Sequence, residues 1–198
     1  LLLENNVTPI FLKGTGFLLQ NFYEDIAERM VGDIDFLVSN DEFFDTVNIL
    51  KTNGYKRTSE KLASPIIGKH YPRLFKKDKI SAVEIHLEMC KKKASQYFNY
   101  NSVSESVVNE KKLFFLGYQD QLSLTILAKQ YNDNGRFYKT ITIRNSYDVY
   151  LLSRKINSLH SIKKYPKLFN ILNTYLAVTS SFMNTSIINY QESRRTKS

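Results

Sequence analysis

Hydrophobic and polar positions along the first half of the chain predict short strands that alternate with helices. Residues 8–12 form an apolar run that begins near a proline and ends at Lys13-Gly14-Thr15-Gly16, which is typical of a buried strand leading into a glycine turn. We expect a helix after this turn, with Thr15 as its N-cap and an apolar face that continues to Ile26. Further strands are predicted at residues 34–38, 70–75 and 80–87, and a second helix between Asp41 and Asn53-Gly54.

The second half of the chain has a different pattern. From about Tyr118 onward apolar residues recur at helical spacing, and few strand signals remain. Residues 95–106, rich in Asn, Ser and Tyr, are the best candidate for a junction. We therefore expect an α/β (α+β) protein with a mixed domain at residues 1–94 and a helical C-terminal region at residues 107–198. Because the chain begins without Met and inside an apparently helical pattern, we expect N-terminal residues to be missing from it.

The charge of the chain favours an anionic partner. It has 28 Lys and Arg against 19 Asp and Glu, a formal net charge of +9. A nucleoside triphosphate, an RNA or an acidic surface would each suit this charge. The basic runs are short and scattered, however, and most such runs are solvated surface.

Cysteine usage and hydropathy narrow the class further. A single cysteine, Cys90, excludes an intrachain disulfide and a multi-cysteine zinc site, and predicts a reduced, cytoplasmic protein. Its ordinary role would be that of a small packing residue. The longest apolar stretches are far shorter than the roughly 18 residues that a membrane helix needs, so no membrane partner is expected.

The segment Gly32-Asp33-Ile34-Asp35-Phe36-Leu37-Val38 carries the clearest chemistry. In a strand, Asp33 and Asp35 would share one face while Ile34 and Phe36 enter the core. Carboxylates held on a rigid strand suit Mg²⁺, which takes one or two of them together with waters and substrate phosphates. Alternatively, the segment is a strand end with two solvated acids, because Asp-x-Asp is common by chance. If both are partly exposed ligands, replacing either with Asn should leave apo stability unchanged or slightly raised.

A second acidic strand strengthens the hypothesis of a metal site. In residues 83–88 the apolar side chains alternate with Glu84, His86 and Glu88. Glu84 would complete a three-carboxylate site, and such a cluster is costly without a cation. The alternative is an antiparallel strand whose polar face meets solvent. For His86, as for His70, a structural hydrogen-bonded histidine is at least as expected as a catalytic one.

The turn Lys13-Gly14-Thr15-Gly16 is a candidate anion site. A turn between a strand and a helix offers free backbone N–H groups, Lys13 adds a positive charge, and glycine lets the backbone approach a triphosphate. Arg29 would neutralise phosphate or orient an aspartate, unless it forms a salt bridge that positions the loop. Asp148, inside an apolar helical segment, is a candidate acceptor of N–H hydrogen bonds or ion-pair partner rather than a ligand.

Several of these motifs together resemble a known family, the uncharacterised nucleotidyltransferase family of the polymerase-beta-like superfamily. The resemblance covers roughly residues 9–90, with a weaker part at residues 143–152. The matching segments, in chain order, are Leu12-Lys13-Gly14, Arg29, Gly32 to Val38, Gly54-Tyr55, His70-Tyr71-Pro72-Arg73-Leu74 and Val83-Glu84-Ile85-His86. Their combination is far more specific than any one of them.

The resemblance implies a small mixed sheet flanked by helices and a reaction class. Asp33, Asp35 and Glu84 would hold Mg²⁺, expected as two ions, and Lys13-Gly14-Thr15 would match the phosphate-binding turn. The expected reaction moves a nucleotide from Mg-NTP to an unidentified acceptor, whether a small molecule, a protein or an RNA, with release of pyrophosphate. Two alternatives stay open: a toxin-like nucleotidyltransferase that acts on tRNA or protein, and a non-catalytic domain that binds nucleotide or docks a partner.

Overall fold

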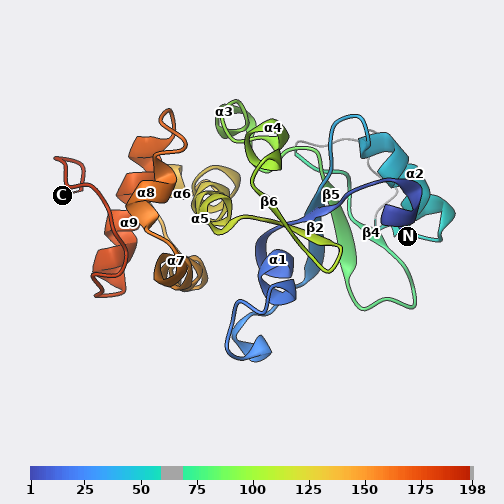
Figure 1. The fold of residues 1–198 in the computed structure, drawn as a ribbon, viewed down its shortest axis with the longest axis horizontal. Helices are drawn as coiled ribbons and strands as arrows, with labels where there is room; N and C mark the ends of the chain where they lie inside the picture. Colours follow the sequence, from blue (N-terminus) through green and yellow to red (C-terminus); the bar gives the residue numbers. More distant parts are fainter. Residues whose placement is uncertain (59–68, 197–198) are drawn as a thin grey trace. The chain divides into compact units, whose positions relative to one another are not determined.

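The chain folds into two compact units, of which the first is built around a β-sheet and the second from helices. The computed structural model describes residues 1–58 and 69–196. The sheet unit contains Leu1–Met89 and Ser104–Leu116, and the helical unit contains Cys90–Val103 and Gly117–Ser198. Figure 1 draws the strands in blue to yellow-green and the helices that follow them in yellow to red.

The sheet is mixed, with strand order β3-β4-β5-β2-β1-β7-β6. β2 pairs with β5 in parallel, β1 pairs with β7 in parallel, and the remaining neighbours are antiparallel. The strands are β1 (Ile10–Phe11), β2 (Asp33–Leu37), β3 (Lys56–Arg57), β4 (Leu74–Phe75), β5 (Ala82–His86), β6 (Val107–Glu110) and β7 (Leu113–Leu116). The predicted α/β (α+β) fold with a mixed sheet flanked by helices is confirmed.

One face of the sheet is apolar and is covered by α2 (Phe43–Thr52), which ends at Asn53-Gly54 as expected. Phe36 of β2 and Ile85 of β5 pack with Phe43 in a buried cluster. Alternation along each strand then directs the intervening side chains, several of them acidic, to the opposite face. The apolar half of each strand thus fixes the register in which the acidic half is presented.

The helix after β1 differs from the expectation. α1 (Lys13–Leu19) begins at the turn itself, has Leu12 as its N-cap, and ends early. Lys13 adopts a left-handed conformation with φ of 52°, so the chain turns from strand into helix without a separate loop. Thr15 is therefore not the N-cap. The chain re-enters a helical turn only in the 3-10 helix Ile26–Glu28, so the predicted single helix was too long.

The segment after residue 104 extends the sheet. β6 and β7 form a hairpin that joins β1, and Phe115 and Leu116 of β7 are fully buried. Lys111 and Lys112 make its turn in left-handed conformations, with φ of 51° and 66°. These residues were expected within the helical region. In the structure the sheet unit takes in Ser104–Leu116, because β7 pairs with β1, about a hundred residues earlier in the chain.

The second unit is helical, as predicted. Buried side chains of α5 pack against α7, α8 and α9. Asp120 of α5 accepts hydrogen bonds from Lys164 Nζ at 2.8 Å and Tyr165 Oη at 2.6 Å, and burial raises the pKa of Tyr165. Asp148 is buried in α7. The helices are α3 (Lys92–Ser95), α4 (Tyr100–Ser104), α5 (Tyr118–Leu127), α6 (Gly135–Tyr138), α7 (Ile143–Lys155), α8 (Ser158–Ile162) and α9 (Phe169–Phe182). Among the described helices, none has the length and apolar character needed to cross a membrane.

A pair of glycine substitutions tests how α1 is seated. Gly16→Ala is expected to lower the free energy of unfolding by about 1 kcal/mol or more, because its Cβ would lie 2.9 Å from the Phe11 carbonyl oxygen. The matched control is Gly32→Ala, whose Cβ would have no heavy atom within 4 Å. Urea denaturation followed by circular dichroism measures both, and equal stability of the two variants would contradict the packing of α1 on β1.

Candidate active site

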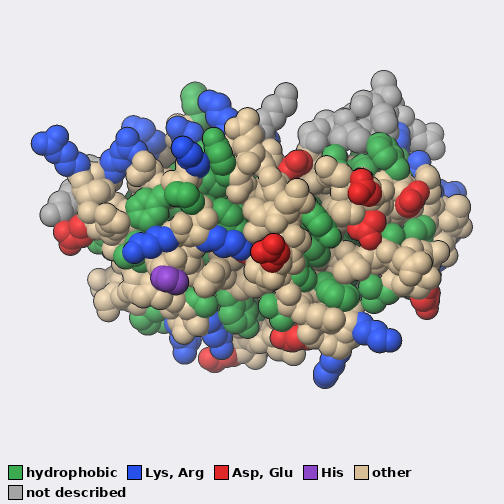
Figure 2. Space-filling view, turned by 45° about the horizontal axis from the view of Figure 1, so that its top comes forward, with side chains coloured by type: hydrophobic (Ala, Val, Ile, Leu, Met, Phe, Trp, Pro, Cys, Tyr) green, Lys and Arg blue, Asp and Glu red, His purple; other side chains and the backbone are tan. Residues whose placement is uncertain are grey.

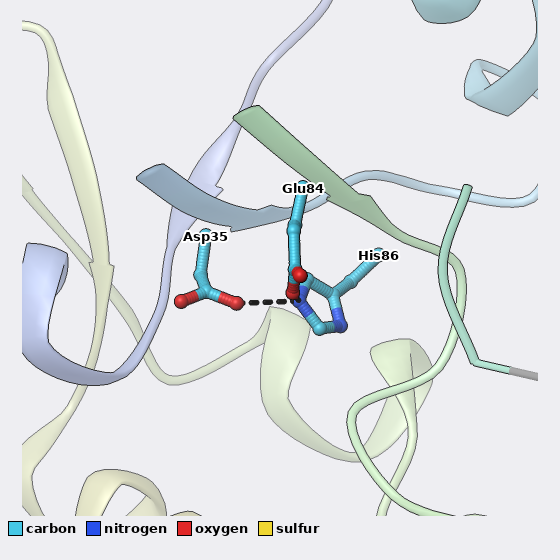
Figure 3. Close-up of side chains that lie close together, drawn as sticks. All are labelled: Asp35, Glu84 and His86. Carbon is cyan, nitrogen blue, oxygen red and sulfur yellow. Dashed lines mark hydrogen bonds and ion pairs between the residues drawn. The ribbon is translucent and has the colours of Figure 1, made fainter. Parts of the chain in front are cut away.

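Neighbouring positions on β2 and β5 carry the acidic side chains. The two strands are parallel, with Asp35 opposite Glu84 and Leu37 opposite His86. Because side chains two residues apart share a face, Asp33 and Asp35 lie on the same side of the sheet as Glu84 and His86. Figure 3 shows Asp35, Glu84 and His86 reaching toward one another from the two strands.

The centre of the cluster is compact and mostly buried. His86 Nε2 lies 2.7 Å from Asp35 Oδ1 and 3.5 Å from Glu84 Oε2. One donor atom from each of these three residues lies within 4.8 Å of the others. The exposed fractions are 9% for Asp35, 7% for Glu84 and 0% for His86, so water screens the charges only weakly.

Two cations balance the carboxylates. Lys13 Nζ forms an ion pair with Asp35 Oδ1 and lies 3.5 Å from His86 Nε2. Arg73, just before β4, bridges the other two acids, with Nη2 2.8 Å from Asp33 Oδ2 and Nε 2.8 Å from Glu84 Oε1. All three predicted carboxylates therefore belong to one connected network, whose charges are largely compensated.

Arg73 and His86 contribute more contacts to the site than the sequence predicted. Arg73 had no predicted role, and its position follows from the antiparallel pairing of Leu74 with Val83, which places Arg73 beside Glu84. The signal for His86 was visible, since it shares the polar face of its strand with Glu84. His70 also adjoins the cluster, with Nε2 4.0 Å from Glu84 Oε2, and burial lowers its pKa.

The expected phosphate turn packs tightly behind β2. Thr15 Oγ1 donates to the Asp33 carbonyl oxygen at 3.0 Å and accepts from the Asp35 backbone N–H at 3.4 Å, so this hydroxyl positions the aspartate strand. A Cβ on Gly14 would lie 2.8 Å from Val31 Cγ2 and 3.3 Å from Arg29 Nη2. The structure thus brings Arg29 against the turn, at a point where only glycine leaves room for it.

The two aspartates have different electrostatic environments. Burial raises the pKa of Asp33 despite the Arg73 guanidinium beside it. Burial also opposes ionisation of Asp35, but the hydrogen bond from His86 and the Lys13 charge outweigh it and hold the Asp35 pKa below its usual value. Hydrogen bonds from His86 and Arg73 likewise overcome burial and lower the pKa of Glu84. Asp35 and Glu84 are therefore ionised at neutral pH.

This donor set fits a divalent cation. Two ionised, buried carboxylates and an imidazole converge within a few ångströms, and a third carboxylate lies beside them on the same face. Carboxylate oxygens are the donors that Mg²⁺ and Mn²⁺ prefer, and imidazole suits the softer metals. Lys13 and Arg73 hold the acids together, since repulsion between the carboxylates would otherwise separate them or raise their pKa values.

Metal ions act on phosphoryl groups in phosphatases, polymerases and nucleases, and a cluster of carboxylates on adjacent strands is compatible with such chemistry. Comparison with known families agrees: the model described as "uncharacterised nucleotidyltransferase" matches residues 1–183. The chain belongs to this nucleotidyltransferase family. No curated protein shows a significant match to it.

Acid denaturation tests the charge network. Because the pKa of Glu84 in the folded protein lies below its ordinary value of 4.5, its stabilisation is present above about pH 4.5 and is lost as pH falls through the lower folded value. Glu84→Gln should lower the free energy of unfolding by about 1–3 kcal/mol at pH 7, because Arg73 and His86 lose this acceptor. The variant should also lose less stability than wild type as the pH falls.

Glu88→Gln is the matched control for Glu84→Gln. Burial raises the pKa of Glu88, so its charge opposes folding at neutral pH, and its removal should leave stability unchanged or higher. Urea melts of both variants in chelator at several pH values measure these effects. Equal losses in the two variants at pH 7 would contradict the network.

Proposed function

We propose that this protein transfers a nucleotide from a metal-bound nucleoside triphosphate to an acceptor, at the carboxylate face of β2 and β5. The observation that carries the proposal is the convergence of Asp35, Glu84 and His86 within 4.8 Å, in a chain that belongs to a nucleotidyltransferase family. The sheet unit is the catalytic domain of this proposal, since it contains all of these residues. The single buried thiol of Cys90 suits a reducing, cytoplasmic setting.

Asp33, Asp35 and Glu84 would hold magnesium, as two ions if the protein follows the two-metal mechanism of phosphoryl transfer. When bound, such ions neutralise the triphosphate and lower the pKa of an attacking hydroxyl. His86 orients Asp35 through its 2.7 Å hydrogen bond. Thr15 fixes the backbone that carries both aspartates, so the ligands are held in place before substrate arrives.

Lys13, Gly14 and Arg29 would receive the phosphates. Lys13 directly precedes Gly14 and the Arg29 guanidinium packs against Gly14, so both supply positive charge at this turn. Lys13 pairs with Asp35, so binding of a triphosphate and its metal would replace one ion pair by another. Arg73 stands at the exposed edge of the cluster, with 53% of its side chain accessible, and can also reach a phosphate.

The reaction is an in-line displacement at the α-phosphorus. The acceptor hydroxyl oxygen forms the new P–O bond, the bond between the α-phosphorus and the bridging oxygen breaks, and pyrophosphate leaves with that bonding pair. The hydroxyl proton passes to a carboxylate, for which Glu84 is the proposed acceptor, or to water. Positioning and charge neutralisation would contribute most of the rate.

Asp33→Asn and Asp35→Asn test the proposal directly. The protein is incubated with each radiolabelled NTP, Mg²⁺ and cell extract, and protein, RNA and small molecules are then separated to find the label. Wild type should transfer label, and each variant should lose about a hundredfold or more of it, because a hard-metal ligand is lost. The control variant Asp41→Asn makes the same charge change at an exposed residue outside the site and should retain transfer.

Thermal melts in chelator separate a chemical defect from a folding defect. Asp33→Asn should melt like wild type, since burial already disfavours the Asp33 charge. Asp35→Asn should melt lower, because Lys13 and His86 lose the carboxylate that they share. The structure thus distinguishes two substitutions that the sequence treats alike. Full transfer by both variants would remove the aspartates from the mechanism, and nucleotide binding without pyrophosphate release in wild type would indicate a non-catalytic domain.

A further inference from the structure

The positive charge of the chain is concentrated in the helical unit. This unit has 15 Lys and Arg against 4 Asp and Glu, a formal net charge of +11, whereas the sheet unit has 13 against 15, a net charge of −2. The excess of positive charge therefore belongs to one of the two units. Figure 2 shows Lys and Arg side chains interspersed with hydrophobic ones on the drawn face of this unit.

A basic cavity lies within the helical unit. Its volume is about 670 Å³, and its lining includes Arg136, Lys139, Lys167 and Arg195. Among the described residues that line it, none is acidic, and Asn170 adds a polar side chain. Four basic side chains in a lining without acidic residues give the cavity a positive potential that attracts a polyanion, because the walls also exclude part of the screening water.

A second cavity of about 380 Å³ adjoins the first. The two share Gln130, Tyr131 and Arg136 in their linings, and the second adds Lys93 and Phe137. Arg136 is held between them, with its guanidinium carbon 5.8 Å from the centre of the Tyr131 ring. The binding surface is therefore elongated, which suits successive phosphates of one chain better than a single small anion.

The short helix α6 exposes two aromatic rings, next in sequence to residues that line these cavities. Gly135 is wedged against backbone, since a Cβ there would lie 2.7 Å from the Lys129 carbonyl oxygen, and Lys139 ends the helix in a left-handed conformation. Phe137 is 80% exposed and Tyr138 is 65% exposed. Two adjacent exposed rings are unfavourably solvated, and a ligand that stacks on them would bury this apolar surface and so gain binding free energy.

We propose that the helical unit binds single-stranded nucleic acid, with phosphates in the two basic cavities and unpaired bases against Phe137 and Tyr138. Basic grooves combined with exposed aromatic rings are how proteins hold single strands, because every base has a face that stacks. A duplex buries its base faces and cannot use the rings, and an acidic polypeptide has no bases. The proposal depends on residues of the helical unit alone and does not require the transfer reaction.

Fluorescence anisotropy of the full chain in chelator tests this binding. The probes are a labelled RNA single strand of about 20 nucleotides, the same sequence as DNA, the corresponding duplex, and polyglutamate. We expect tight binding of single-stranded RNA, with or without binding of single-stranded DNA. The duplex and polyglutamate should bind at least about tenfold more weakly. Equal binding of duplex, or of polyglutamate, would overturn the proposal, as would no binding at low salt.

Charge variants locate the site. The double variant Lys139→Gln, Lys167→Gln should weaken single-strand binding about tenfold or more and reduce the slope of log Kd against log salt by about 1.4. The matched control Arg154→Gln, Lys155→Gln removes the same charge from exposed side chains outside both cavity linings, and should change Kd less than about threefold. Equal effects of the two double variants would overturn the assignment to the cavities.

Aromatic variants separate stacking from charge. Phe137→Ala and Tyr138→Ala should each weaken binding about fivefold or more while leaving the salt slope unchanged, and both should fold because the rings are exposed. Unchanged affinity in both variants would overturn the proposed stacking. Asp33→Asn should bind the strand like wild type, so failure of the transfer reaction and failure of this binding site are distinguishable.

Discussion

The parallel pairing of β2 with β5 is the interaction on which the site depends. It sets Asp35 opposite Glu84 and brings His86 within 2.7 Å of Asp35, although about fifty residues separate the two strands in sequence. The register is fixed from the other face, where Phe36 and Ile85 pack beneath α2. A shift by one residue would turn the acids into the core and the apolar side chains outward, so core packing and site geometry are one constraint.

The same arrangement brings carboxylates close enough to repel one another, and two cations held by the fold compensate their charge. Carboxylates gathered at low exposure repel one another, and Lys13 and Arg73 each sit within hydrogen-bond reach of them. Lys13 comes from the turn that opens α1, and Arg73 from the approach to β4. The compensation leaves Asp35 and Glu84 ionised, which is the state that a metal requires.

Much of this site follows from local sequence. The period of two in strands places Asp33 and Asp35 on one face, and no long-range information is needed for that step. The contribution of Arg73 could not be predicted in this way, because it depends on which strand lies beside β5. The β6–β7 hairpin was missed for a similar reason, since its place in the sheet comes from pairing with β1 across the intervening chain. The start of α1 was also predicted wrongly: Lys13 is left-handed and Leu12, not Thr15, is the N-cap.

Metal binding at the carboxylate face can be measured by Mn²⁺ titration followed by electron paramagnetic resonance, because only free Mn²⁺ gives the sharp signal. Wild type is expected to bind Mn²⁺, more tightly when an NTP is present, and Asp35→Asn is expected to lose most of this binding. The exposed Asp41→Asn variant should titrate like wild type. Undiminished Mn²⁺ binding by Asp35→Asn would show that Asp35 is not a metal ligand.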